Sequence, residues 1–226
     1  MMPWLVLEYA PVATFELRPS NTTKTGGKTL LCPTPYTIKM ALLDRMIRYY
    51  GLDYGRDAFP VIRDLGVWLR PPEAVAINRT FQKILRPPFK NSAWTSTIAM
   101  REFCVQAGTL GIALSLPGDD LLSALTEMAT AINYFGQRGS FYQIESGYES
   151  DGPPAGYVDA TGPTQTRLMG FLQRMDDMHP EATFDDVSAF NPRSKGGRVA
   201  YNVVFPYRLV ANASNHTVWR WMEVGE

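Results

Sequence analysis

The chain has 226 residues, of which 45% are hydrophobic and 19% charged, and its 22 basic residues balance 22 acidic ones. This length is enough for one good hydrophobic core, or for one domain with an appendage. No apolar run approaches the roughly 18 residues of a membrane-spanning helix, so we expect no contact with a membrane. The first residues lack the basic segment of a signal peptide, and a cytoplasmic location is expected.

The balanced charge hides an asymmetry between the two halves of the chain. Residues 1–110 contain 14 basic and 8 acidic residues (14 − 8 = +6), whereas residues 111–226 contain 8 and 14 (8 − 14 = −6). Such a split is compatible with a polyanion bound to the first half. Taken alone, however, the split favours a solvated surface on which like charges cluster.

Two cysteines, Cys32 and Cys104, lack the Cys-x-x-Cys spacing of a zinc site, and His179 and His216 are the only histidines. Four soft ligands at these spacings do not indicate a metal centre, and we predict no metal and no other cofactor. The thiols are expected to be small buried hydrophobic groups.

The chain begins with a predicted strand, or two short ones, over Trp4–Leu17. A polar loop follows and ends in Gly26-Gly27-Lys28-Thr29, which resembles the tail of a phosphate-binding P-loop. Thr22 stands where the first glycine of that motif belongs, so nucleotide hydrolysis is not expected. The loop is either an ordinary basic loop or one that touches a nucleic-acid backbone. Its basic residues are Arg18, Lys24 and Lys28.

Thr34 and Pro35 predict the start of a helix, with a threonine cap and proline in the first turn. Apolar residues then recur at helical spacing until Gly51, which predicts the end of the helix. Its more polar side is expected to carry Lys39, Arg45 and Arg48. A short helix or turn is predicted over Arg56–Leu65.

Two strands are predicted next, Gly66–Arg70 and Glu73–Ile84, separated by Pro71-Pro72. The segment 79–91 interleaves basic and aromatic side chains, the combination that binds the phosphates and bases of a single-stranded nucleic acid. It could equally be an edge hairpin kept soluble by its charges. The residues concerned are Arg79, Phe81, Lys83, Arg86, Phe89 and Lys90.

Thr97–Val105 and Thr109–Leu116 predict a hairpin about Ala107-Gly108. A second helix, capped by Asp119, carries an apolar stripe that ends at Ile132.

The stretch Ile132–Ile144 contains a tight turn, with Gly136 and Gly139 on either side of the single cation Arg138. Glycines allow backbone N–H groups to approach a phosphate closely. The alternative is a helix C-cap followed by a core strand.

The predicted order, strand–helix–strand–strand–helix–strand, is that of an α+β protein with a ferredoxin-like βαββαβ domain over residues 1–145. The hairpin insert of that domain covers about residues 71–97. Residues 146–226 are predicted to form a second, β-rich part. Its first segment, residues 146–189, contains 8 acidic residues but only two basic ones, Arg167 and Arg174. A short helix is predicted at Leu168–Met175, and strands at Val199–Leu209 and Thr217–Met222.

Taken together, these segments resemble the RAMP superfamily of CRISPR-associated (Cas) proteins, which have RRM-like, ferredoxin-like RNA-binding domains. Within it the chain is most similar to the fifth Cas protein family, the Cascade subunit that caps the five-prime handle of the guide RNA (crRNA). Three features carry the resemblance: the basic entry to the first helix, Lys28–Leu43; the basic insert 79–91, at the place of that family's thumb hairpin; and the glycine turn Gly136–Ser140.

The resemblance implies a non-catalytic role in antiviral defence, in which the first helix and the glycine turn bind handle phosphates and the thumb clamps the RNA. The implied partners are crRNA, the Cascade backbone subunit, the Cascade large subunit and target DNA near the PAM. The implied RNA-binding residues are Arg18, Lys24, Gly26, Gly27, Lys28, Thr34, Tyr36, Lys39, Arg45, Arg79, Phe81, Lys83, Arg86, Lys90, Gly136, Arg138 and Gly139.

Two other functions stay open. Some relatives cut precursor crRNA without metal, which requires a base for the 2′-OH and an acid for the leaving oxygen. The histidines that could serve are His216 and His179, both far in sequence from the basic half. The acidic second half is also compatible with a protein-only interaction module.

Overall fold

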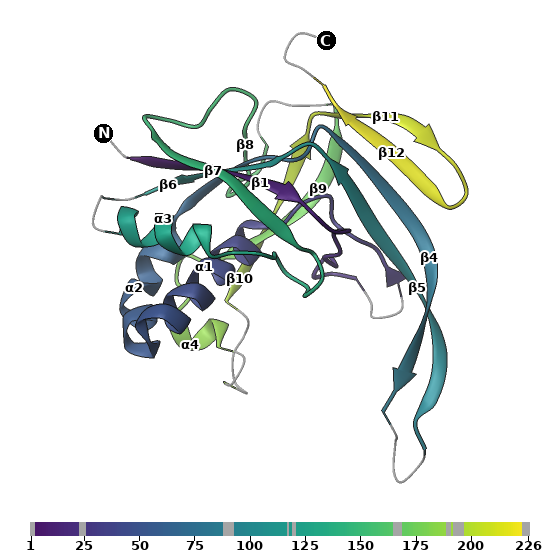
Figure 1. Cartoon of the computed structure of the whole chain (residues 1–226), viewed down its shortest axis with the longest axis horizontal. Coiled ribbons are helices and arrows are strands. Elements are labelled where there is room, and N and C mark those ends of the chain that lie inside the picture. Colours follow the sequence, from purple (N-terminus) through teal and green to yellow (C-terminus); the bar gives the residue numbers. More distant parts are fainter. Residues whose placement is uncertain are drawn as a thin grey trace.

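The structure is a computed structural model that describes residues 3–22, 26–87, 93–116, 118, 121–164, 169–188, 191 and 197–222. Within these residues the strands form two five-stranded sheets and one two-stranded sheet, and the helices gather beside the first sheet (Figure 1). The predicted α+β class is confirmed.

The first sheet has the strand order β7-β1-β6-β3-β8, and all its neighbouring strands are antiparallel. Its strands are β1 (Trp4–Pro11), β3 (Gly66–Arg70), β6 (Leu110–Ser115), β7 (Tyr142–Ser150) and β8 (Val158–Asp159). Side chains alternate between the two faces of a strand. Accordingly Leu5, Leu7 and Tyr9 pack in the main core, while Val6 packs with Ala113 and Tyr157 in a small second cluster.

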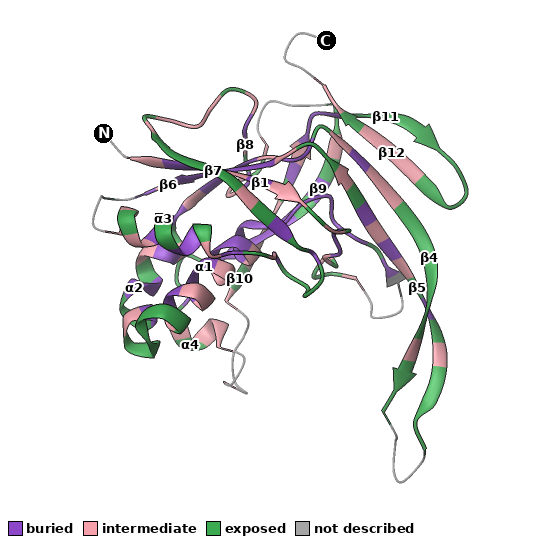
Figure 2. Ribbon diagram, in the orientation of Figure 1, coloured by how far each residue is buried: buried purple, intermediate pink, exposed green. Residues whose placement is uncertain are grey.

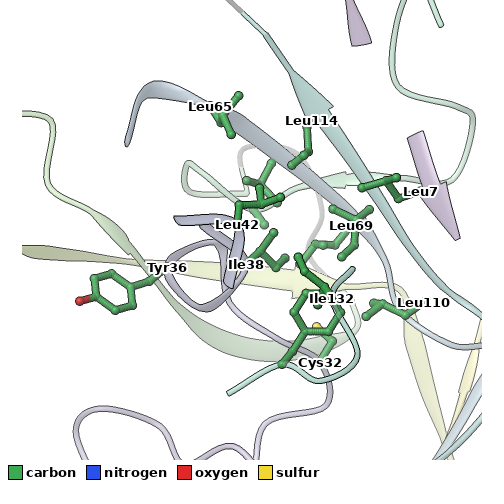
Figure 3. Packing of buried hydrophobic residues seen from close by; sticks show 14 of the residues in the cluster. Leu7, Cys32, Tyr36, Ile38, Leu42, Leu65, Leu69, Leu110, Leu114 and Ile132 are labelled. Carbon is green, nitrogen blue, oxygen red and sulfur yellow. The ribbon is translucent and has the colours of Figure 1, made fainter. Parts of the chain in front are cut away.

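The helices α1 (Pro35–Tyr50), α2 (Leu52–Asp64) and α3 (Leu122–Thr130) lie on one side of the first sheet (Figure 1). A fourth, short helix, α4, covers Phe184–Val187. Figure 3 shows the resulting core, in which Ile38 and Leu42 of α1 face Leu7, Leu69 and Leu114 of the sheet. The predicted start of α1 is confirmed by the Thr34 cap, and Gly51 ends the helix as expected. The cap predicted for the later helix, Asp119, lies outside the described residues.

The second sheet has the order β11-β12-β4-β5-β2. Its members are β2 (Gly26–Gly27), β4 (Ala74–Arg86), β5 (Thr95–Ala107), β11 (Tyr207–Asn212) and β12 (His216–Trp221). Strands β4 and β5 pair continuously from Ala74↔Ala107 to Arg86↔Thr95, and together they form a long arm. Figure 2 shows that the arm is partly buried near the body of the protein and exposed along its outer half.

The predicted pairing of Thr97–Val105 with Thr109–Leu116 is wrong. Strand β5 pairs with β4, whereas β6 pairs with β1 and β3 in the other sheet. The reason lies in burial: Leu110–Leu114 is buried on both faces, as the centre of a covered sheet requires, whereas β5 is mostly exposed or half-buried. Gly108, with a φ of 90°, marks the change of direction between the sheets.

The third sheet pairs β9 (Phe171–Met178) with β10 (Arg198–Phe205). The helix predicted up to Met175 is therefore wrong for residues 171–175, because alternate side chains such as Gln173 and Met175 are buried while Leu172 and Arg174 are not. Met175, Val203 and Phe205 join the same core as β1 and α1. Residue 145, the predicted end of the first domain, lies within β7.

Candidate nucleic-acid interface

A groove of about 520 Å³ lies along α1 from its N-terminal end to Arg45, and we call it the first groove. Five of the residues implied in RNA binding line it, although they come from separate segments of the chain. They are Arg18, Thr34, Tyr36, Arg45 and Gly136.

The N-terminal end of α1 is built to face this groove. The Oγ1 atom of Thr34 accepts a hydrogen bond from the backbone N–H of Thr37 at 3.3 Å, and Pro35 follows at the first helical position. Because backbone dipoles align along a helix, its N-terminus carries a partial positive charge that favours an anion. Figure 3 shows the ring of Tyr36 directed away from the packed Ile38 and Leu42.

The glycine turn borders the same groove. Gly136 and Gly139 have φ values of 75° and 109°, which side chains rarely permit. A Cβ atom on Gly136 would lie only 2.9 Å from Cδ1 of Leu17, so this position also requires close approach. The turn presents Arg138 to solvent. Ser140 anchors it, because its Oγ atom accepts a hydrogen bond from the backbone N–H of Glu16 at 3.0 Å.

Two further cations of the first groove, Arg174 of β9 and Arg198 of β10, were not among the expected residues. Arg198 lies over the ring of Tyr36, with 3.9 Å between its guanidinium carbon and the ring centre. Four arginines and two aspartates line the groove, giving a charge of 4 − 2 = +2. Local sequence offers no signal for these two arginines, since both belong to the part of the chain that is acidic overall.

A second groove, of about 280 Å³, lies between β2 and the tip of the β11–β12 hairpin. Lys28, Arg79 and His216 line it together with Glu102. Glu102 accepts hydrogen bonds from Arg79 Nη2 at 3.0 Å and from the backbone N–H of Thr29 at 3.2 Å.

His216 is far from the basic residues in sequence but not in space. Strand β12 pairs with β4, and His216 stands opposite Asn78, beside Arg79. Its Nδ1 atom is 2.9 Å from Oδ1 of Asn215, and its side chain is exposed. His179 lines neither groove, and its Nδ1 atom accepts a hydrogen bond from the backbone N–H of Glu181.

The arm carries its side chains on two faces. Phe81, Lys83 and Leu85 share one face with Ile98 and Met100 of β5, which stand opposite Lys83 and Phe81. Phe81 is 71% exposed, an unusual fraction for a phenylalanine without a partner surface. Arg86 is also exposed, on the other face. Lys90 and Phe89 lie outside the described residues.

Lys39 does not belong to the interface. Its residue is 1% exposed, and its Nζ atom lies 2.7 Å from Oδ1 of Asp177 and 2.8 Å from the backbone oxygen of Arg63. Burial lowers the pKa of Lys39 and raises that of Asp177, and in each case the partner's charge opposes the change. The sequence placed Lys39 on the polar side of its helix, but β9 covers that position.

The expected cations are not gathered in one place. Lys28 lines the second groove, while Lys83 on the arm and Arg138 on the glycine turn line neither groove. Gly26 and Gly27 form β2, where a Cβ on Gly27 would lie 2.2 Å from the backbone oxygen of Met100. Lys24 lies outside the described residues.

Both cysteines are fully buried, as expected. Burial raises the pKa of the Cys32 thiol to about 12, although a hydrogen bond from Gln173 opposes the rise. Among the described residues no group of three or more potential ligands is arranged to hold a metal ion. Nor does any helix over the described ranges combine the length and apolar character of a membrane span.

No protein-family model matches this chain. A curated CRISPR-associated protein Cas5 from Archaeoglobus fulgidus is 20% identical over 232 aligned positions, which cover 99% of each chain. The crystal structure of a CRISPR protein from Archaeoglobus fulgidus matches with a TM-score of 0.50 and 13% identity, over 98% of this chain and 92% of that one. A chain of the crystal structure of a Csm1–Csm4 cassette in complex with pppApA has a TM-score of 0.36 and 9% identity.

Proposed function

We propose that this chain, a homologue of Cas5 along its full length, is a non-catalytic subunit of a type I CRISPR effector complex that binds the five-prime handle of crRNA. The observation that carries the proposal is the first groove. There Arg18 and Gly136, from two distant segments, lie beside a face of α1 that runs from its positive N-terminal end to Arg45. Such a surface suits the phosphates of a single-stranded RNA better than a small apolar ligand.

The two grooves are lined in part by neighbouring residues of the segment between β2 and α1. Lys28 and Thr29 line the second groove, and the next residue, Leu30, lines the first. An RNA strand that crosses this segment would place one phosphate near Lys28 and others near Arg18 and Arg45. Arginine and lysine contacts to phosphates fix the position of the strand, whereas base contacts supply sequence preference.

The arm is the second part of the proposed site. Lys83 and Arg86 would bind phosphates, and Phe81 offers a flat face on which a base can stack. We retain Arg79 here although Glu102 already pairs with it, because its side chain is half exposed. Arg138 and Gly139 would approach the RNA from the glycine turn. Lys24 and Lys90 stay in the proposal from sequence alone.

We further propose which partners the chain contacts and how it divides into domains. The backbone and large subunits of Cascade, and target DNA near the PAM, are expected to contact this chain in the cytoplasm. We assign the β7-β1-β6-β3 part of the first sheet, with α1 and α3, to a ferredoxin-like RAMP domain. Because β7 runs to Ser150, we move the boundary predicted at residue 145 to the end of that strand and take the rest of the chain as the extension.

The test is the RNA affinity of the purified full chain, measured by fluorescence anisotropy with a labelled single-stranded RNA over a range of salt concentrations. We expect Arg18→Gln and Arg45→Gln each to weaken binding about threefold and to reduce the salt dependence. Arg208→Gln is the matched control, since Arg208 is exposed but lines neither groove. A chain without salt-dependent RNA affinity, alone or in its complex, would point instead to a protein-only interaction module.

One observation favours a second function, metal-independent cleavage of precursor crRNA. His216 lines the second groove with Lys28 and Arg79, so a base and two cations flank the same space. A histidine there could accept the proton of a 2′-OH, whose oxygen attacks the phosphorus. The bond from phosphorus to the 5′-oxygen then breaks, and Lys28 or water gives that oxygen a proton. Incubation with precursor crRNA in the presence of EDTA decides the matter. Cleavage that is abolished in His216→Ala would support it, and intact RNA would leave binding as the function.

A further inference from the structure

The carboxylate of Asp176 connects three segments at the first groove. It lies on β9 with its side chain 11% exposed, and its Oδ1 atom accepts a hydrogen bond from Oγ of Ser20 at 2.9 Å. Arg198 Nη1 lies 3.6 Å from its Oδ2 atom, and Arg174 Nε lies 3.8 Å from Oδ1. A largely buried carboxylate therefore holds a loop residue of the basic half and two arginines of the C-terminal strands.

Strand geometry explains why these groups meet. Arg174 and Asp176 are two positions apart on β9 and so point to the same face of the sheet. Asp176 pairs with Ala200 of β10, which makes Arg198 its diagonal neighbour on that face. The next residue along the strand, Asp177, faces the opposite way, into the core, where it pairs with Lys39.

Both arginines retain binding capacity. Their side chains are 45% and 47% exposed, and their nitrogen atoms lie beyond ordinary hydrogen-bond distance from Asp176. A guanidinium carries five N–H donors in a fixed fork, and a phosphate can accept two of them at once. Arg198 is further held by the ring of Tyr36 beneath it. Each guanidinium is thus restrained on one side and open on the other.

We propose that Asp176 is a positioning residue of the RNA site, which orients Arg174 and Arg198 so that they bind phosphates of a single-stranded RNA in the first groove. The inference rests on the proposed function and extends it to the acidic half of the chain. A carboxylate in a groove for RNA repels phosphates by its own charge. The presence of Asp176 is explained if the affinity gained by orienting the two arginines is larger than the affinity lost to that repulsion.

The proposal predicts that removing the charge of Asp176 weakens RNA binding, whereas electrostatic repulsion alone predicts that it strengthens binding. Asp176→Asn removes a negative charge, which by charge alone strengthens RNA binding. We expect it instead to weaken binding of a labelled, mixed-sequence single-stranded RNA by threefold or more. The slope of log K against log salt concentration is expected to become shallower by up to about 1.4. This is about 0.7 for each of two phosphates that the arginines no longer neutralise. Glu149→Gln is the matched control, because it removes one charge from an exposed site on β7 outside the groove and is expected to leave affinity unchanged or slightly higher.

Arg174→Gln and Arg198→Gln are each expected to weaken binding about threefold. If Asp176 acts through Arg198, the effect of Arg198→Gln on affinity shrinks when Asp176 is already Asn. Thermal unfolding monitors folding of every variant. A smaller fraction of folded protein raises the apparent Kd by the same factor at every salt concentration and so leaves the salt dependence unchanged.

Unchanged or tighter RNA binding by folded Asp176→Asn overturns the inference while leaving the proposed function in place, provided that Arg18→Gln still weakens binding. If Asp176→Asn does not fold, the RNA affinities of Arg174→Gln and Arg198→Gln test the inference instead. Wild-type affinity in both variants overturns the inference. If the wild-type chain binds no RNA, the proposed function and this inference fall together.

Discussion

Lys39 of α1 and Asp177 of β9 form an ion pair in the core, with Nζ 2.7 Å from Oδ1 and side chains 2% and 8% exposed. The lysine also donates to the backbone oxygen of Arg63 at the end of α2, so one ammonium group joins two helices and a strand. Because the cost of burying both charges opposes their attraction, such a pair adds little net stability, whereas loss of one partner is costly.

Lys39→Met is expected to lower the free energy of unfolding by about 3–5 kcal/mol, because it leaves the Asp177 carboxylate buried without its partner. The double variant Lys39→Met/Asp177→Leu removes both charges and is expected to be close to wild type in stability. Urea unfolding of wild type, the two single variants and the double variant measures the coupling. Equal destabilisation in the single and double variants would contradict this account.

The same pair predicts a pH dependence. Burial raises the pKa of Asp177, and Lys39 opposes that rise, so the pKa rises further in Lys39→Met. A carboxyl group with a raised folded-state pKa takes up a proton on folding, and its stability penalty shrinks as pH falls toward its ordinary value of 3.8. The destabilisation by Lys39→Met is therefore expected to be smaller at about pH 5 than at about pH 7.5. A destabilisation that grows on acidification would exclude the explanation.

The glycine turn offers a matched pair of substitutions. Gly139→Ala meets no atom within 4 Å, so only the strain of its φ of 109° remains, about 1–2 kcal/mol. Gly136→Ala has comparable strain and in addition brings Cβ to 2.9 Å from Leu17, which lines the first groove. We expect Gly136→Ala to destabilise the protein more, as measured by urea unfolding. A smaller loss of stability in Gly136→Ala than in Gly139→Ala would show that the Leu17 side chain moves aside at little cost.

Gly27→Ala tests how β2 holds Lys28 at the second groove. The added Cβ would lie 2.2 Å from the backbone oxygen of Met100, which cannot rotate away as a side chain can. Separation of β2 from β5 is expected to cost about 1–3 kcal/mol and to weaken RNA binding through Lys28. Gly152→Ala, with no atom within 4 Å, is the control for stability and RNA affinity.

Phe81→Ala separates binding from stability. Since Phe81 is 71% exposed, its removal is expected to change the free energy of unfolding by no more than about 0.5 kcal/mol. Loss of a stacked base would weaken RNA affinity by about 1–3 kcal/mol. Tyr148→Ala on β7, another exposed aromatic residue, is expected to leave RNA affinity unchanged. Equal RNA affinity of Phe81→Ala and wild type would remove the arm from the proposed site.

Several features depend on residues close together in the sequence, and these were predictable. Thr34 and Pro35 define the start of α1, and Gly136 and Gly139 define a turn, because capping and positive φ are properties of a few adjacent residues. The strand character and exposure of the basic segment around Phe81, and the burial of both cysteines, follow from composition in the same way, but the strand that pairs with that segment does not.

What the tertiary structure alone decided are the relations between distant segments. Strands β5 and β6 separate into different sheets, Lys39 becomes buried under β9, and Arg198 and His216 of the acidic half reach the basic half. A local pattern specifies which face of an element is apolar, but not which distant element covers it. That choice is made by packing of the whole core, where burial on both faces of β6 and pairing of β12 with β4 determine which charges meet.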